Sequence, residues 1–187
     1  MSRWRSTGIV ALRDAKLKTF PDDVLNLDKS VRTLDLTHNK IVDIPMEISK
    51  LINIQRLVLD DNNIERLPIN LGKLQSLKVM TLDGNRITSL PDELGQLVRL
   101  ERLSILGNML TCLPETIGSL RNIPANLLKD CKALQNISLH NNPISMDQFQ
   151  QMEGFEEFEA RRRKKFDKQI DSNVMISSKG LDEGVDK

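Results

Sequence analysis

Four asparagines recur at one fixed interval along this chain, and this interval constrains the fold more than any other feature. Each lies 23 residues after the one before, at Asn39, Asn62, Asn85 and Asn108. Around each Asn the same apolar frame returns, L-x-L-x-x-N-x-L-x-x-L-P, with Met or Ile in place of some Leu. Such a period is typical of stacked repeats, in which no unit buries its apolar face alone. The frame therefore predicts a solenoid and favours a binding platform over a catalyst.

Each unit has two halves with different periodicity. In the second unit Leu57 and Leu59 alternate with other residues, which is the period expected of a short strand with one buried face. The Asn that follows suits a buried turn, because its side chain can satisfy backbone groups that lack ladder partners. Residues 68–77 carry Leu at intervals of three, which predicts a short helical or 3₁₀ segment on the opposite side. Glycines recur in this half and are expected to permit close packing or unusual backbone angles, at Gly72, Gly95 and Gly118.

The frame resembles the leucine-rich repeat family. Its L-P turn and L-G-x-L back segment are similar to the intracellular Ras-group type, and the ends, 4–8 and 152–169, resemble a plant branch of it. The resemblance implies a right-handed α/β solenoid (horseshoe), with parallel strands lining a concave face. It further implies a non-enzymatic protein-interaction scaffold in intracellular signalling. By family analogy, its partner would be a protein such as a small GTPase or a phosphatase.

One elongated domain with atypical ends is expected, because repeat arrays need caps. The expected parts are an N-terminal cap with a degenerate first repeat (1–30), four regular repeats (31–122), a junction with the last repeat (123–144), a capping helix (145–170) and a flexible tail (171–187). Residues 145–148 have the capping-box pattern of a helix start, and Gly154 allows a break in that helix. The last coil is expected to be covered by Phe149, Met152, Phe155 or Phe158.

The period fails once, between Asn108 and Asn142, which are 34 residues apart instead of two periods. Two turn signals, at Pro114 and Pro124, follow one another with no strand pattern between them. This favours an internal deletion of a half-repeat, alone or with whole repeats, and predicts two unpaired strand edges. A natural irregular coil with an extended loop is the structural alternative. The functional alternative is a shortened or spliced variant with an incomplete binding surface, acting as a regulator or a non-functional product.

Composition excludes several classes of function. The net charge of +1 and an aromatic content of 3% without Tyr argue against nucleic acid as a partner. No apolar run is long enough for a membrane span, and the N-terminus has no apolar signal region. Ser follows the initiator Met, which excludes N-myristoylation of the chain as it stands. With no disulfide pairs at the ends, a cytoplasmic monomer is expected, with a nuclear or membrane-peripheral pool left open.

The candidate partner-binding residues are the outward positions on and beside the strands. They give the concave face a basic side and an acidic side, which would orient a partner of complementary charge. The alternative is ordinary solvated charge. The ten residues are Arg32, Asp35, Arg56, Asp60, Asp61, Lys78, Thr81, Asp83, Arg102 and Ser104.

Other reactive residue types suggest little chemistry. His38 and His140 belong to no nucleophile, metal or phosphate motif, so no catalytic residue, cofactor or metal is expected. Cys131 falls near a Leu column and is expected to be a buried thiol, whereas Cys112 lies at a variable edge. The basic run 161–165 is either a nuclear-import or anionic-surface patch, or the basic end of the capping helix. The second interpretation is favoured, because two glutamates precede this run at ion-pair spacing.

Overall fold

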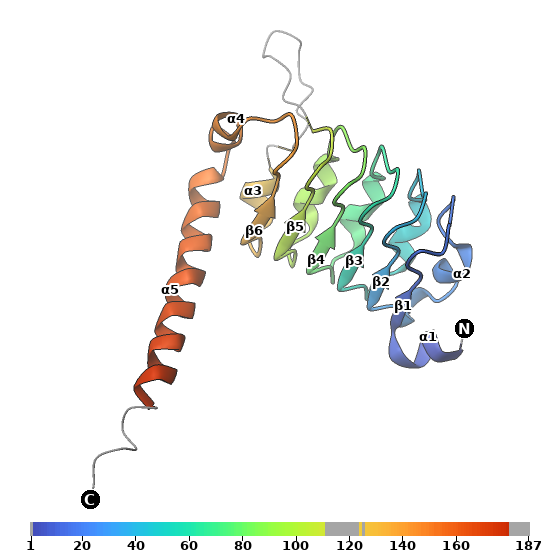
Figure 1. The fold of residues 1–187 in the computed structure, drawn as a ribbon, viewed down its shortest axis with the longest axis horizontal. Helices are drawn as coiled ribbons and strands as arrows, with labels where there is room; N and C mark the ends of the chain where they lie inside the picture. Colours follow the sequence, from blue (N-terminus) through green and yellow to red (C-terminus); the bar gives the residue numbers. More distant parts are fainter. Residues whose placement is uncertain (1, 111–123, 125, 180–187) are drawn as a thin grey trace, which may run out of the picture.

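The computed structural model describes residues 2–110, 124 and 126–179. Within this part of the chain, six three-residue strands form one parallel sheet in the order of the sequence (Figure 1). They are β1 (Ile9–Ala11), β2 (Thr33–Asp35), β3 (Arg56–Val58), β4 (Val79–Thr81), β5 (Arg102–Ser104) and β6 (Asn136–Ser138). This is the α/β leucine-rich solenoid that the repeat predicts.

The repeat period sets the register of the sheet. Residues one period apart are direct neighbours on adjacent strands, as in the series Leu34, Leu57, Met80 and Leu103. These middle residues point into the core and are fully buried. Because side chains alternate along a strand, the first and third residues of each strand face outward.

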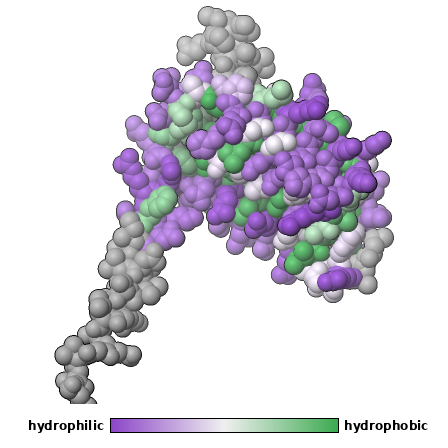
Figure 2. All heavy atoms as spheres, in the orientation of Figure 1, coloured by the Kyte–Doolittle hydropathy of each residue, from purple (hydrophilic) through white to green (hydrophobic). Residues whose placement is uncertain are grey.

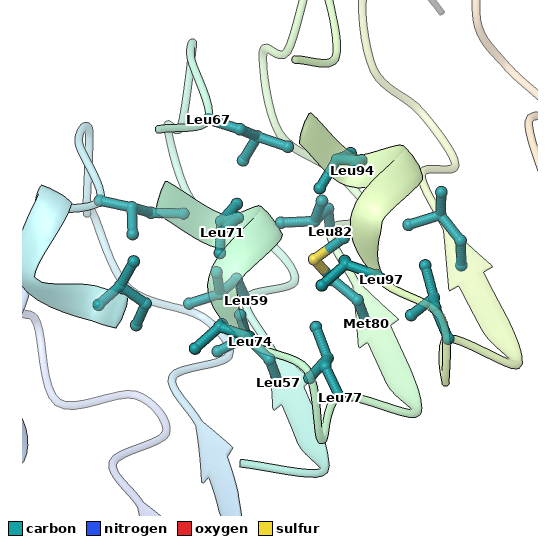
Figure 3. Close-up of a cluster of buried hydrophobic side chains, with 14 of the residues drawn as sticks. Leu57, Leu59, Leu67, Leu71, Leu74, Leu77, Met80, Leu82, Leu94 and Leu97 are labelled. Atoms are coloured by element: carbon teal, nitrogen blue, oxygen red, sulfur yellow. The ribbon is translucent and has the colours of Figure 1, made fainter. Parts of the chain in front are cut away.

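The second half of each coil forms short turns on the other side of the sheet. They are the 3₁₀ segments η1 (Asp28–Ser30), η2 (Met46–Lys50), η3 (Ile69–Lys73) and η4 (Asp92–Gln96), and the helices α2 (Asp22–Leu25) and α3 (Leu127–Asp130). Pro45, Pro68 and Pro91 precede η2, η3 and η4, with φ near the value that the proline ring imposes. Leu side chains from strands and turns point toward one another and form a continuous core (Figure 3).

The repeated Asn joins each coil to the one before it. The Asn62 Oδ1 accepts the backbone N–H of Ile41 at 3.0 Å, and its Nδ2 donates to the carbonyl oxygen of Leu36 at 3.0 Å and of Leu59 at 3.1 Å. Five coils share this pattern of an Oδ1 acceptor for the preceding coil, through Asn39, Asn62, Asn85, Asn108 and Asn142. The side chain thus satisfies backbone groups at a turn where no strand partner exists.

The residue before the Asn position adopts a left-handed backbone conformation in every coil. The series is Asp14 (φ 53°), His38 (55°), Asp61 (53°), Gly84 (65°), Gly107 (61°) and Asn141 (57°). Gly, Asn, Asp and His are the residue types that tolerate this region best. Backbone sterics therefore limit which residues can stand here.

Gly72 serves the close packing that the sequence predicts, rather than an unusual backbone angle. A Cβ on Gly72 would collide with the backbone carbonyl of Glu93 in the next turn. Gly95 likewise has no room for a Cβ, because the side chain of Asn126 lies against it. Gly118 lies outside the described residues.

The sheet continues across the irregular junction, so the predicted pair of unpaired strand edges is wrong. β5 pairs directly with β6, with Arg102 opposite Asn136 and Ser104 opposite Ser138. Asn142 also bonds to the preceding coil, accepting the N–H of Leu110 at 3.1 Å. Parallel pairing constrains the strands but not the length of chain between them, which is why one long coil can keep the register. The turn expected at 114–120 lies outside the described residues.

Helices close both ends of the solenoid. α1 (Ser2–Thr7) lies beside β1, while α4 (Met146–Gln150) and α5 (Phe155–Lys179) follow β6 (Figure 1). The Ser145 side chain accepts from the N–H of Gln148 at 3.2 Å, which confirms the capping box. Gly154, with φ 83°, separates the two helices, at the break in the capping helix that the sequence allows. α5 continues into the segment that was expected to be a tail from residue 171.

An aromatic cluster and one arginine fix α5 to the last coil. Phe149 and Phe158 are buried and meet edge to face, with ring centroids 6.3 Å apart. The guanidinium of Arg161 donates to the carbonyl oxygen of Leu128 at 2.6 Å and of Leu134 at 3.3 Å. The first residue of the basic run is therefore structural. The four-residue spacing predicts pairs of Glu157 with Arg161 and of Glu159 with Arg163. Instead, Arg161 binds carbonyl oxygens, and Glu159 pairs with Arg162 at 3.1 Å.

Candidate functional site

Three columns of outward positions form the concave face, the side of the sheet opposite the 3₁₀ turns. The first residues of the strands give Ile9, Thr33, Arg56, Val79, Arg102 and Asn136, and the third residues give Ala11, Asp35, Val58, Thr81, Ser104 and Ser138. The column two positions further on is Arg13, Thr37, Asp60, Asp83, Leu106 and His140. In Figure 1 the terminal helices stand beside β1 and β6, so that they flank the sheet at its two ends.

Asp35 is held by an ion pair that the sequence analysis did not identify. It is only 5% exposed, and it accepts from Arg13 Nε at 2.7 Å and from the Thr37 hydroxyl at 2.6 Å. Burial raises the pKa of Asp35, but the hydrogen bonds from Arg13 and Thr37 lower it more, and the net pKa lies below its usual value. Arg13 and Thr37 are equivalent positions of adjacent coils, so Arg13 lies beside Thr37 and therefore close to Asp35. This equivalence was the sequence signal that could have revealed the Arg13–Asp35 pair.

Asp60 and Asp83 each bond to the coil that follows. Asp60 accepts from the Thr81 hydroxyl at 3.1 Å and from the Asp83 N–H at 2.9 Å. Asp83 repeats this geometry with the Ser104 hydroxyl at 2.7 Å and the Leu106 N–H at 2.8 Å. Burial is the main cause that raises the pKa of Asp60, with the negative charges of Asp83 and Asp61 adding to it. Four predicted contact residues are thus also links between coils.

His38 has two carboxylate neighbours that no sequence motif indicated. Its Nε2 lies 2.9 Å from Asp61 Oδ2, and its Nδ1 lies 3.7 Å from Asp14 Oδ1. All three residues occupy the left-handed position of successive coils, which brings them together. The spacing of 23 to 24 residues was the available signal.

The four predicted cations do not form one row. Arg56 and Arg102 begin β3 and β5 and stand in the first column, with Val79 between them. Arg32 and Lys78 come one residue before β2 and β4. All four side chains are exposed. The basic side of the concave face therefore consists of two positions on strands and two positions directly before strands, at the margin of the sheet where the strands begin.

The described residues offer little for metal or thiol chemistry. Within the described ranges, no group of three or more His, Cys, Asp or Glu side chains could hold a metal ion. Cys131 is buried, as the repeat position predicts, and its Sγ lies 3.1 Å from the carbonyl oxygen of Leu94. Burial raises the pKa of the Cys131 thiol to about 11, which leaves it un-ionised near neutral pH. Cys112 lies outside the described residues.

The visible surface gives no large apolar patch either. Figure 2 shows a mostly hydrophilic face, on which hydrophobic residues form separated spots. No described helix is long and apolar enough to cross a membrane. What the geometry provides is a rigid, polar and unbroken strand surface with charge on both margins.

The sequence matches known repeat families over its regular part. The matches are to profiles described as Leucine rich repeat over residues 52–110 and Leucine Rich Repeat over residues 30–51. The chain is 54% identical to Plant intracellular Ras-group-related LRR protein 7 of Oryza sativa subsp. japonica, over 100% of this chain and 94% of that protein. It is 46% identical to protein 8 of the same name and organism over 57 residues, covering 30% of this chain and 15% of that protein. The chain belongs to the leucine-rich repeat family, in its intracellular Ras-group type.

Solved structures share the same architecture. A Leptospira interrogans LRR protein superposes with a TM-score of 0.61 at 28% identity, over 72% of this chain and 37% of that one. The plant peptide hormone receptor RGFR1 in complex with RGF2 gives 0.52 at 30% identity, over 67% and 23%. An internalin from Listeria monocytogenes gives 0.54 at 23% identity, over 68% and 33%, and shows the fold alone. This chain thus spans well under half of each structure.

The alignment with rice protein 7 contains a length difference. It has 245 positions, whereas this chain has 187 residues, so 58 positions hold no residue of this chain.

Proteins of this family are generally interaction modules without catalytic activity.

Proposed function

We propose that this protein is a non-enzymatic interaction scaffold in intracellular signalling, and that it binds a protein partner on the concave face. The supporting observation is the continuous six-stranded sheet, whose outward side chains form one pre-organised surface. Little conformational freedom would be lost on binding, because backbone and side-chain hydrogen bonds already join neighbouring coils. The plant peptide hormone receptor RGFR1, which has a similar fold, was solved in complex with RGF2, and that is compatible with such a use.

The ten candidate residues have two proposed roles. Arg56, Arg102 and Asp61, which are exposed, would make charged contacts, with Arg32 and Lys78 steering the approach at the margin. The other five would fix the shape of the surface, since each already bonds within it, namely Asp35, Asp60, Thr81, Asp83 and Ser104.

The first partner class to test is a small GTPase of the Ras type, and a phosphatase is the second. This choice follows the printed name of the rice relative and is an analogy, since the fold does not define its partner. We propose a cytoplasmic location, by analogy with a relative that is named intracellular. We also propose that the protein is a monomer.

A charge-reversal experiment tests the concave face. The double variant Arg56→Glu/Arg102→Glu should weaken binding of a purified Ras-type GTPase, in its GDP or GTP form, by at least about tenfold. Arg66→Glu/Arg86→Glu is the matched control, because it makes the same change outside the strands. If both double variants lose the same affinity, the effect comes from the change in net charge and not from the concave face. If neither a Ras-type GTPase nor a phosphatase binds the unaltered chain, both proposed partner classes are excluded.

The length difference is the observation behind a second candidate function. We propose, as the alternative, that the chain is a shortened form which regulates a longer one. Placing 58 further residues between Asn108 and Asn142 would extend their interval from 34 to 92 residues, which is four periods of 23. Because β5 still pairs with β6, such a form would keep an intact but shorter binding surface. Mass spectrometry of plant protein extracts can detect peptides with the sequence of this chain between Asn108 and Asn142. If only peptides of a longer form are found, this alternative is contradicted.

A further inference from the structure

A cleft lies at the N-terminal end of the solenoid, between α1, η1 and the end of η2. Its volume is about 400 Å³, and its lining includes Arg5, Asn26, Asp28, Lys29, Lys50 and Ile52. None of its lining residues belongs to the concave face. The function proposed above therefore makes no use of it.

Gly8 sets the close approach that forms the cleft. It has φ 69°, and a Cβ there would lie 2.9 Å from the carbonyl oxygen of Ser30. Its own carbonyl oxygen accepts the N–H of Thr33 at 3.0 Å. These contacts hold the end of α1 against η1, so that Arg5 and Lys29 line the same cleft.

The cleft carries an excess of positive charge. Three cations line it against a single carboxylate, that of Asp28, which leaves two unmatched positive charges. Among the described residues, no ion pair involves Arg5, Lys29 or Lys50. The three cations come from three separate elements, α1, η1 and η2, so their convergence is a property of the fold rather than of a local run of basic residues.

We propose that this cleft binds the phosphate group of a phosphorylated serine or threonine in a protein partner. A phosphomonoester carries a charge of roughly −1.5 to −2 at pH 7 and presents three acceptor oxygens. That charge matches the excess of two, whereas a carboxylate would match only half of it. Arg5 supplies a planar donor fork, and the two lysines supply point charges that adapt to the remaining oxygens.

The lining favours a peptide over a lipid surface. Inserted apolar side chains strengthen docking on a membrane, and Ile52, at 42% exposed, is the one large exposed apolar residue lining this cleft. A peptide needs no more than one such contact beside its phosphate. The side-chain amide of Asn26 can bond to the peptide backbone.

Titration of the full chain with a short phosphoserine peptide tests the proposal. The probe is Ala-Gly-phosphoserine-Gly-Ala in low salt, with the unphosphorylated peptide as its counterpart. Binding can be followed by calorimetry and by the fluorescence of Trp4, the single tryptophan of the chain, which precedes Arg5 in α1. The phosphorylated peptide should bind, and Lys29→Gln and Lys50→Gln should each weaken it by about tenfold.

Lys73→Gln provides the matched control. Lys73 ends η3 as Lys50 ends η2, but it does not line the cleft, so its loss should change affinity less than twofold. An equal loss for Lys73→Gln and Lys50→Gln would overturn the proposal in favour of unspecific attraction. So would equal binding of the two peptides, or binding only to phosphatidylcholine vesicles that contain a phosphatidylinositol phosphate. Circular dichroism of each variant checks that the fold is retained.

Discussion

At the residue scale, the Asn column joins the coils with side-chain hydrogen bonds. Asn62 is 5% exposed, and its amide bonds to the backbone of its own coil and of the one before. Removing the side chain leaves a buried N–H and two buried carbonyls without these partners. Such groups are costly because no water replaces the lost bonds.

Asn62→Ala should lower the free energy of unfolding by about 2–3 kcal/mol, because the Ile41 N–H loses its acceptor. The measurement is urea denaturation followed by circular dichroism. Asn63→Ala is the neighbouring control, since the hydrogen bond of Asn63 to Ile41 uses its backbone N–H. A similar loss in both variants would mean that the amide of Asn62 has no special role.

Asp35, which is buried, and Asp60, which is half-buried, should respond to pH in opposite directions. The pKa of Asp35 is lowered in the fold, so its stabilising contribution is present above the usual aspartate range and is lost as pH falls through the folded pKa. Asp35→Asn should therefore cost about 1–2 kcal/mol at pH 7, discounted for the exposed Arg13 partner, and less at pH 3.5.

Asp60 supplies the comparison. Its pKa is raised, chiefly by burial, so the folded state binds the proton more tightly than the unfolded state. Relative to the unaltered chain, Asp60→Asn should gain stability as pH rises through the folded pKa. Denaturation at pH 3.5, 5 and 7 measures both variants, and parallel pH profiles for the two would refute the assignment.

At the element scale, the sequence predicts what repeats and misses what depends on contacts between repeats. The frame around Leu57 and Leu59 gives the strands, and Pro68 with its regular Leu spacing gives η3, because period and proline geometry are local properties. The Arg13–Asp35 pair and the carbonyl contacts of Arg161 link coils or caps that no local pattern joins. Asp60 and Thr81 were identified as surface residues, but their mutual bond depends on stacking.

Arg161 is the element-scale anchor of α5. Arg161→Met should lower stability by about 1–3 kcal/mol, because the Leu128 carbonyl loses a charged donor. Amide hydrogen exchange should show faster exchange in α5 than in the unaltered chain. Arg163→Met, an exposed site on the same helix, should stay within about 0.5 kcal/mol. Unchanged exchange in α5 of Arg161→Met would show that the aromatic cluster alone holds the helix.

At the scale of the whole molecule, the stack is one continuous body from β1 to β6. The sequence shows that the period fails between Asn108 and Asn142, but it could not show whether the strands on either side would pair. β5 and β6 can pair only if Leu103 and Ile137 stand opposite each other, as they do in the structure. Only the folded arrangement of the coils decides this register.

Amide hydrogen exchange on the intact chain measures this continuity. The N–H of Ile105, which bonds to Ser138 across the junction at 2.9 Å, should be protected to a similar degree as that of Leu82, which bonds to Ser104 at 2.9 Å. The reason is that neighbour contacts govern stability in such arrays. Fast exchange at Ile105 with slow exchange at Leu82 would mean that the last coil separates from the rest.

The Asn column also has a direction, and it bears on how the protein is made. Each side chain completes the coil that precedes it, so a coil is finished only after the next Asn has been added. On the ribosome, the N–H of Ile87 gains its acceptor Asn108 after 21 further residues, whereas the N–H of Leu110 must wait 32 residues for Asn142. The newest coil of the growing chain is thus always incomplete, and the wait is longest at the junction. During synthesis the N–H of Leu110 therefore stays without its acceptor over a longer stretch of chain than the N–H of Ile87.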